Sequence, residues 1–364
     1  MGHNLGRGFI VLGIILLTAS GVSGAPDPSA IESYLRAQRD RYNIPGLSLV
    51  VAKDGRVIYA NHSGLANVEL GVPVTTDTVF QIQSITKTFT ATAVMMLVEE
   101  GTLSLDDPIG KHLEGTPQSW KPITLRHLLS HTSGIKDFIN EPTASLRVDV
   151  SERDVLDATA PRPLNFPPGE KYAYSNTNYH LLAMVIRKVT GQFYGDFLAE
   201  RIFKPLGMDH TRVQDLSAVI PGRAAGYRWE AGKLTNGEYV AQSILSYGGG
   251  GILSAAEDLA KWDAALRSEK LLKKATLQQM WEPMTFNDGR KSTYGLGWGV
   301  NQYKGHRFVQ HSGGHVTGFQ TFIRRYLDDG LTVIVLVNQS GNVDPGKIAA
   351  RVAGMFDPAL ATED

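Results

Sequence analysis

The alternation of apolar and polar residues predicts strands near both ends of the chain and helices between them. Apolar and β-branched runs at residues 47–53 and 56–61 flank Asp54-Gly55, a dipeptide typical of a two-residue hairpin turn. From residue 80 to about residue 245, apolar residues recur mainly at helical spacing. The later strands and the final helix are expected at residues 294–300, 307–311, 319–326, 331–338 and 345–356.

Strands from both ends of the chain imply one antiparallel sheet with flanking helices and an inserted, mainly helical region, an α/β (α+β) fold. The sheet part is expected to cover about 29–80 and 246–358, and the helical part about 81–245. A groove between the two parts is the expected place for a site. Ser-x-x-Glu patterns at residues 29–32 and 254–257 predict capping boxes at two helix starts.

Residues 1–24 have the three-part pattern of a secretory signal peptide. Arg7 precedes an apolar run at residues 9–17, and small residues lead to an expected cleavage site near Gly24. The run is shorter than the roughly 20 apolar residues that cross a bilayer, so no stable membrane insertion is expected after cleavage. Residues 25–364 are therefore predicted to be exported to the periplasm or the extracellular space.

Composition narrows the possible chemistry. The 36 Lys and Arg residues balance 36 Asp and Glu residues, so the chain has no excess of positive charge that would attract nucleic acid. With 42% hydrophobic residues, the chain is expected to be globular. Because it contains no cysteine, disulfides, thiolate metal sites and a cysteine nucleophile are all excluded. A covalent nucleophile must therefore use oxygen or nitrogen.

Three short motifs carry candidate chemistry. Ser84 and Lys87 form Ser-x-x-Lys at the start of a predicted helix, a spacing that puts the amine and the hydroxyl on one face. Tyr174 and Asn176 alternate in a loop before another predicted helix, and residues 311–314 read His-Ser-Gly-Gly at the end of a strand. Taken singly, each motif also fits an ordinary cap, loop or turn.

The order and spacing of the three motifs together resemble the serine β-lactamase and penicillin-binding D,D-peptidase superfamily. The chain is most similar to the branch with class C β-lactamases, D,D-carboxypeptidases, D-aminopeptidases and related esterases, in which Tyr-x-Asn is the middle element. The resemblance covers nearly all of the chain after the predicted signal peptide, and it extends through residues 128–134, 166–169, 205–208 and 248–252. It implies a β-lactamase/transpeptidase-like fold and acyl transfer through serine.

The resemblance implies a role for each motif residue. Ser84 would be the nucleophile and Lys87 its proton acceptor or hydrogen-bond partner. Tyr174 would carry the proton to the leaving group, with a phenol pKa or proton position tuned by Lys87. Asn176 would hold Lys87 and a substrate amide or carbonyl. The backbone N–H groups of Ser84 and Gly314 would form the oxyanion hole.

The third motif departs from the family's β-lactamases, where a lysine begins it and a threonine follows. Here His311 and Ser312 occupy those positions and precede Gly313 and Gly314, and all four are expected to bind substrate. Because histidine is mostly neutral near pH 7, we expect an esterase or a D-amino-acid peptidase-like enzyme. The alternatives are a class C-like β-lactamase and a penicillin-binding sensor protein with negligible turnover. The expected partner is a small ester, peptide or β-lactam.

Other candidate sites are weaker. His127 and His131 have the spacing of a zinc-binding helix, but no glutamate lies between them and no third ligand is evident. The glycine run at residues 248–251 lacks the Gly-Lys-Ser/Thr of a phosphate loop, and close packing or a groove edge explains it better. No metal and no organic cofactor is expected, and the sequence leaves the oligomeric state open.

Overall fold

The computed structural model describes residues 26–140, 146–245 and 248–362, so the predicted signal peptide lies outside the described residues. The α-helices are α1 (Pro28–Tyr42), α2 (Thr86–Glu99), α3 (Leu125–Leu129), α4 (Glu152–Thr159), α5 (Asn176–Thr190), α6 (Tyr194–Leu198), α7 (Lys204–Leu206), α8 (Gln242–Leu245), α9 (Ala256–Arg267), α10 (Lys274–Met280) and α11 (Pro345–Phe356). The strands are β1 (Gly46–Lys53), β2 (Arg56–Asn67), β3 (Val72–Pro73), β4 (Phe80–Gln81), β5 (Arg212–Val213), β6 (Tyr227–Glu230), β7 (Lys233–Asn236), β8 (Ile252–Ser254), β9 (Gly299–Tyr303), β10 (His306–His315), β11 (Phe319–Tyr326), β12 (Leu331–Val337) and β13 (Gln339–Ser340).

The main sheet joins the two ends of the chain. Its strand order is β3-β2-β1-β12-β11-β10-β9, and all of its pairings are antiparallel. The seam lies where β1 pairs with β12, from Leu47 opposite Val337 to Lys53 opposite Leu331. The predicted fold class, an antiparallel sheet built from both chain ends with flanking helices, is therefore confirmed.

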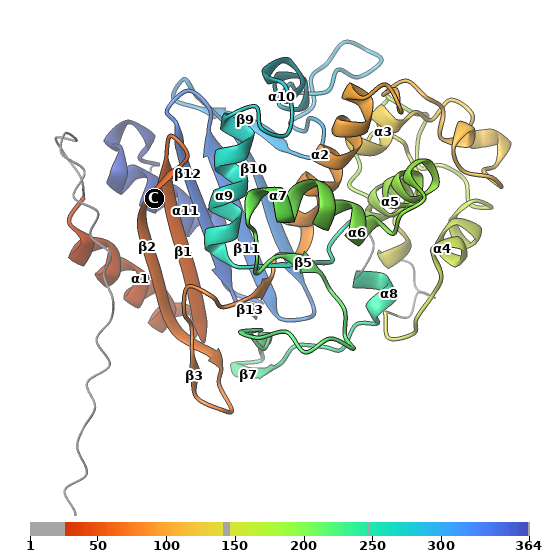
Figure 1. Ribbon diagram of the computed structural model, residues 1–364. Coiled ribbons are helices and arrows are strands. Elements are labelled where there is room, and N and C mark those ends of the chain that lie inside the picture. The colour runs from red at the N-terminus through yellow and green to blue at the C-terminus, as the bar shows by residue number, and fades with distance from the viewer. Residues whose placement is uncertain (1–25, 141–145, 246–247, 363–364) are drawn as a thin grey trace, which may run out of the picture.

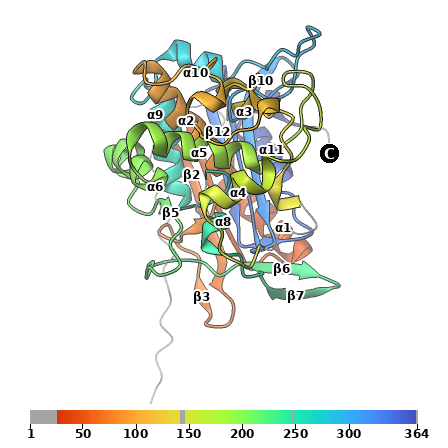
Figure 2. The ribbon, with the colours of Figure 1, turned by 90° about the vertical axis from the view of Figure 1, so that its right-hand side faces the viewer.

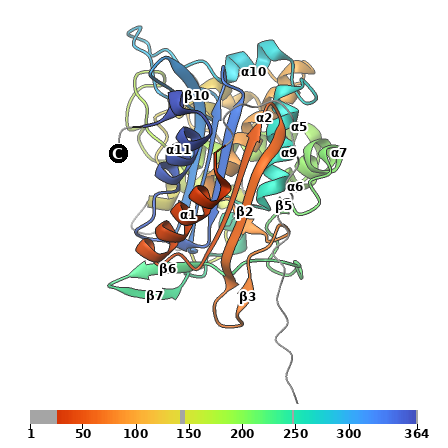
Figure 3. The same ribbon diagram turned by 90° about the vertical axis from the view of Figure 1, so that its left-hand side faces the viewer.

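Helices cover both faces of this sheet. Figure 3 shows α1 and α11 lying along the outer face, whereas Figure 1 shows α9 across the opposite face with α2 and α5 beyond it. The central strands serve both layers because successive side chains point to opposite faces. On β12, Val333 and Val335 belong to the core under α1 and α11, and Ile334 and Leu336 belong to the larger core on the other side. Both layers are thus built on one sheet.

The segment predicted to be mainly helical contains α2 to α8 but also three strands (Figure 2). Within it, β6 and β7 form a hairpin. This hairpin pairs with β13, a short strand that follows β12 in the sequence. Apolar and polar residues alternate over only four positions in each of these strands, which is too short a stretch to predict a strand within a mainly helical pattern. Among the described residues, no helix combines the length and apolar character that a membrane crossing requires.

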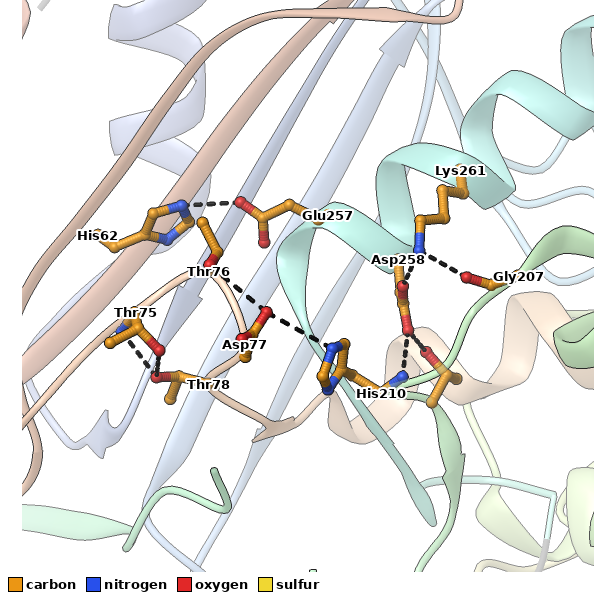
Figure 4. A network of polar contacts seen from close by, with 11 residues as sticks. His62, Thr75, Thr76, Asp77, Thr78, Gly207, His210, Glu257, Asp258 and Lys261 are labelled. Atoms are coloured by element: carbon orange, nitrogen blue, oxygen red, sulfur yellow. Dashed lines mark hydrogen bonds and ion pairs between the residues drawn. The ribbon is translucent and has the colours of Figure 1, made fainter. Parts of the chain in front are cut away.

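Neither predicted capping box forms. The N-cap of α1 is Asp27, whose side chain accepts from the Ser29 backbone N–H, and the N-cap of α9 is Ala255. Glu257 instead reaches across to His62 on β2, at 2.7 Å (Figure 4). The next residue, Asp258, is buried and accepts hydrogen bonds from the segment at residues 207–211 and from Lys261. The acidic first turn of α9 therefore ties the sheet to the helical region.

Candidate active site

Ser84 and Lys87 lie on consecutive turns at the junction of two helical segments. Ser84 is in a short 3-10 helix, η1 (Gln83–Ile85), which passes directly into α2. The Lys87 Nζ atom lies 3.1 Å from the Ser84 Oγ atom. Gln83, the residue before Ser84, has a left-handed backbone with φ of 54°. Hydrogen bonds from its buried side chain to Gln81 and Thr317 support this conformation.

The amine of Lys87 is fully buried and surrounded by acceptors. Besides Ser84, its Nζ atom donates to Asn176 Oδ1 at 2.8 Å and to the Gly249 carbonyl oxygen at 2.6 Å. Burial lowers the pKa of Lys87 to about 7, and the charge of Asp137 opposes this shift. A neutral amine keeps two N–H groups for the two carbonyl-type acceptors, which cannot donate. Its lone pair is then left for the hydroxyl of Ser84.

Asn176 links Lys87 to an acidic residue that the sequence analysis did not single out. As the first residue of α5, Asn176 accepts from Lys87 through Oδ1 and donates through Nδ2 to Asp137 Oδ2 at 2.9 Å. The carboxylate thereby fixes the orientation of the amide. Burial raises the pKa of Asp137, although its hydrogen bond with Asn176 and the charge of Lys87 oppose that shift.

Tyr174 lies over the amine, with Lys87 Nζ 4.8 Å from the centre of its ring. Although 36% of the residue is exposed, its phenol lies in the pocket, and burial raises the pKa of Tyr174 well above its ordinary value. A hydrogen bond with Ser84 opposes the shift only in part. Lys87 is therefore not found to lower the phenol pKa, and Tyr174 stays protonated at neutral pH. A proton position set by Lys87 stays a prediction.

His131 holds the loop that carries Tyr174. Its ring lies against that of Tyr174 in a tilted arrangement with centres 4.3 Å apart, and its Nδ1 atom accepts from the Ser175 backbone N–H at 3.2 Å. Burial holds the pKa of His131 well below its ordinary value, so the ring is neutral. His127 bonds to Thr124 instead. Within the described ranges, no group of three His, Cys, Asp or Glu side chains is arranged to hold a metal ion.

The His-Ser-Gly-Gly motif, residues 311–314, lies near the carboxy-terminal end of β10. The neighbouring strand β9 pairs only as far as Gln310, so residues 311–315 pair with β11 alone and leave their other edge unpaired by a strand. Gly313 is required where β10 meets η1, since a Cβ atom there would lie 2.4 Å from Thr321 Oγ1 and 2.5 Å from the Ile82 carbonyl oxygen. Gly314 is less crowded, since a Cβ atom there would make only an ordinary contact with Gln320 Cγ at 3.6 Å.

The ring of His311 is buried and hydrogen-bonded within the protein. It is 6% exposed, its Nδ1 donates to the Ser312 carbonyl oxygen at 2.7 Å, and its Nε2 accepts from the Tyr294 hydroxyl at 2.9 Å. Both ring nitrogens are thus engaged within the protein. Burial lowers the pKa of His311 to about 3, which makes the ring neutral, as the sequence suggested. Neither His311 nor Ser312 is among the residues that line the cavity, so their contact with substrate stays a prediction.

A cavity of about 130 Å³ opens over Ser84. The candidate site residues Ser84, Tyr174, Asn176 and Gly314 line it, together with Gly249 and His315. Its apolar lining comes from Phe138, Ile139 and Ile244. The site therefore combines a nucleophile, a base and an enclosed apolar wall.

The residues that the motifs missed come from distant segments. Gly249 belongs to the glycine run, which packs against α2: Thr90 donates to the Gly248 carbonyl oxygen, and Ile252 N–H donates to Thr86. The run therefore packs closely at Gly248 and also forms an edge of the cavity at Gly249 and Gly250. Asp137 follows the motif at residues 128–134, which pointed to the right neighbourhood without marking the carboxylate.

Comparison with known proteins agrees with this geometry. The sequence profile of the family described as Beta-lactamase matches residues 31–354. Penicillin-binding protein 4* of Bacillus subtilis (strain 168) is 33% identical over 82% of this chain and 69% of its own length. D-aminopeptidase of Gluconobacter oxydans (strain 621H) is 28% identical over 92% of this chain. This chain spans 64% of that relative's length.

A solved structure gives the same result. The D-stereospecific amidohydrolase from Streptomyces sp. superposes with a TM-score of 0.78 at 27% identity, covering 92% of this chain and 99% of that one. The similarity thus extends over nearly the whole described fold.

Proposed function

The chain belongs to the Beta-lactamase family, and on this premise we propose that it is a serine hydrolase that cleaves small ester or amide bonds through an acyl-enzyme on Ser84. One observation carries the proposal: Lys87 Nζ lies 3.1 Å from Ser84 Oγ, while its other two partners are obligate acceptors. A buried amine with a pKa of about 7 is well matched to take a proton near neutral pH.

In the first half of the proposed reaction, Ser84 Oγ attacks the substrate carbonyl and its proton moves to Lys87 Nζ. The backbone N–H groups of Ser84 and Gly314 stabilise the oxyanion of the tetrahedral intermediate. When the bond to the leaving group breaks, the proton passes from Lys87 through the Tyr174 hydroxyl to that group. In the second half, a water molecule attacks the acyl carbon and gives one proton to Lys87. As the bond between the acyl carbon and Ser84 Oγ breaks, Lys87 returns that proton to Ser84 Oγ, and the acid is released.

The proposed substrates are esters and D-amino-acid amides rather than β-lactams. A neutral, buried His311 supplies no cation for a substrate carboxylate, where the family's β-lactamases have lysine. The apolar wall of Phe138, Ile139 and Ile244 suits an aliphatic or aromatic substituent. Two relatives, by their names, act on D-configured substrates: a D-aminopeptidase and a D-stereospecific amidohydrolase.

A second candidate is a penicillin-binding protein that forms a long-lived adduct and turns over slowly. The relative named penicillin-binding protein 4* favours it. An adduct of Ser84 with a penicillin that persists for hours, together with negligible turnover of esters and amides, would support this alternative and contradict the hydrolase.

Export is proposed as well. It is supported by the apolar run at residues 9–17 behind Arg7 and by the small residues that follow. Amino-terminal sequencing of protein secreted by an expression host tests it. A mature terminus near Ala25 is expected, and an intact Met1 in the cytoplasmic fraction would contradict it.

The substrate proposal is tested by steady-state turnover of the p-nitroanilides of D- and L-phenylalanine, a short p-nitrophenyl ester and a chromogenic cephalosporin. Ser84→Ala is the test variant, and Ser119→Ala on the exposed surface is the matched control. We expect turnover of the ester and of the D-anilide that requires Ser84. Fast Ser84-dependent hydrolysis of the cephalosporin alone would overturn the substrate assignment but not the mechanism.

A further inference from the structure

Strand β10 loses one of its two neighbouring strands just before it reaches the cavity over Ser84. Among the described strands, β9 pairs with it only as far as Gln310, so residues 311–315 are held by β11 alone. In an antiparallel strand, alternate residues direct their backbone N–H and C=O groups to the same side. Ser312 and Gly314 therefore present these groups to one edge, and Gly314 lines the cavity together with Ser84.

The ring of His311 binds the strand edge where the neighbouring strand has ended. Its Nδ1 atom donates to the Ser312 carbonyl oxygen at 2.7 Å, which fixes the backbone two residues before Gly314. Gly313 and Gly314 follow in succession, and glycine has more backbone freedom than any other residue. The direction of the Gly314 N–H therefore depends on how firmly Ser312 is held.

Tyr294 holds the ring of His311 in turn. The Tyr294 hydroxyl lies 2.9 Å from His311 Nε2, and it is also close enough to the Tyr179 hydroxyl to interact with it. Tyr179 donates to the Leu129 carbonyl oxygen at 2.8 Å. A network of two hydroxyls and one imidazole thus joins the carbonyl oxygen of Leu129 to that of Ser312.

The protons available in this network decide the direction of each hydrogen bond. Both of its ends are carbonyl oxygens, which only accept. The O–H of Tyr179 and the one N–H of the neutral His311 ring are therefore used at the two ends. The O–H of Tyr294 is left for His311 Nε2, which only accepts when the ring proton is on Nδ1. Tyr294 thereby selects the tautomer in which His311 donates to Ser312.

We propose that Tyr294 and His311 are positioning residues for the oxyanion hole. By fixing the Ser312 carbonyl they hold the end of β10, so that the Gly314 N–H points at the developing oxyanion. The inference rests on the proposed hydrolase function and deepens it. It gives His311 a role that depends on hydrogen bonding rather than on charge or on contact with substrate, in agreement with its exposure of only 6%.

The first test removes only the hydroxyl of Tyr294. The kcat and KM values of Tyr294→Phe are measured with p-nitrophenyl butyrate. A misdirected oxyanion donor weakens binding of the transition state and not of the ester, so kcat should fall by about tenfold or more while KM changes by less than about twofold.

Tyr227→Phe is the matched control for this variant. It also removes a buried hydroxyl that is hydrogen-bonded, in this case to Glu69 and to the Val68 backbone N–H. Tyr227 is not among the described residues that line the cavity. The control should lose stability as Tyr294→Phe does, but its kcat should equal that of the unaltered protein.

The second test separates hydrogen bonding from charge at His311. His311→Asn keeps an N–H donor near the position of Nδ1 but cannot ionise, whereas His311→Leu has no donor. We expect kcat of the Asn variant to exceed that of the Leu variant by about fivefold or more, because one hydrogen bond is worth about that much.

Equal kcat values for the two His311 variants, or a Tyr294→Phe variant that matches Tyr227→Phe, would overturn the proposal. A loss that appears in KM alone would also overturn it, because it would show that these side chains bind the ester directly. Ester turnover that survives Ser84→Ala would instead show that the hydrolase proposal has failed, so the two failures are distinguishable.

Discussion

Lys87 Nζ lies 3.1 Å from Ser84 Oγ, and Lys87 is fully buried. Because burial lowers the pKa of Lys87 to about 7, the amine titrates near physiological pH. The lysine can thus serve as the proton acceptor for Ser84.

The first prediction concerns pH. Only the neutral form of Lys87 accepts the proton of Ser84, so kcat/KM should rise with pH through an apparent pKa near 7 and fall away below it. Tyr174 should add no acidic limb, because burial raises its pKa and it stays protonated. The profile is measured with an ester that does not ionise between pH 5 and 9. An acid limb below about pH 5 would show that Lys87 is not the group that titrates.

The second prediction concerns Asp137. Its negative charge raises the pKa of Lys87, so Asp137→Asn should lower that pKa and move the acid limb of kcat/KM to lower pH. A purely structural role would reduce activity at every pH and leave the limb in place. Asp106→Asn, at an exposed carboxylate on the surface, is the control and should leave the profile unchanged.

The third prediction uses adjacent glycines. Gly313→Ala would place a Cβ atom 2.4 Å from Thr321 Oγ1 and 2.5 Å from the Ile82 carbonyl oxygen. Overpacking of this kind lowers the free energy of unfolding by roughly 1–3 kcal/mol. Gly314→Ala meets nothing closer than 3.6 Å and should fold nearly as well. Equal denaturation midpoints for the two variants would contradict the packing of β10 against η1.

The sequence alone predicted part of the fold and part of the site. The fold class, the hairpin at Asp54-Gly55 and the convergence of Ser84, Lys87, Tyr174 and Asn176 followed from local patterns and a family resemblance. The carbonyl oxygen of Gly249, which accepts from Lys87, and the carboxylate of Asp137, which accepts from Asn176, could not be predicted in this way, because they lie 50 or more residues from Lys87 and have no fixed spacing to it. His311 was expected to contact substrate, but its orientation depends on the hydroxyl of Tyr294, which no motif includes.

The fourth prediction concerns the buried ion pair of Asp263 on α9 with Arg325 on β11, in which both side chains are at most 1% exposed. Asp263→Ala would leave the guanidinium of Arg325 buried without its carboxylate, and it should lower the free energy of unfolding by about 3–5 kcal/mol. Asp328→Ala removes an exposed partner of Arg307 and should cost about 0–1 kcal/mol. The two variants are compared by urea denaturation. Similar midpoints would contradict the prediction that the buried ion pair contributes more to stability than the exposed one.

The central claim is that catalysis proceeds through an acyl group on Ser84. It is tested most directly by mixing the protein with the p-nitrophenyl ester of N-acetyl-D-phenylalanine, quenching in acid within the first turnovers and measuring the intact mass. We predict one added acyl group, which peptide mapping places on Ser84 and which Ser84→Ala lacks. Product formation with no adduct on Ser84, at a rate that Ser84→Ala preserves, would contradict the account.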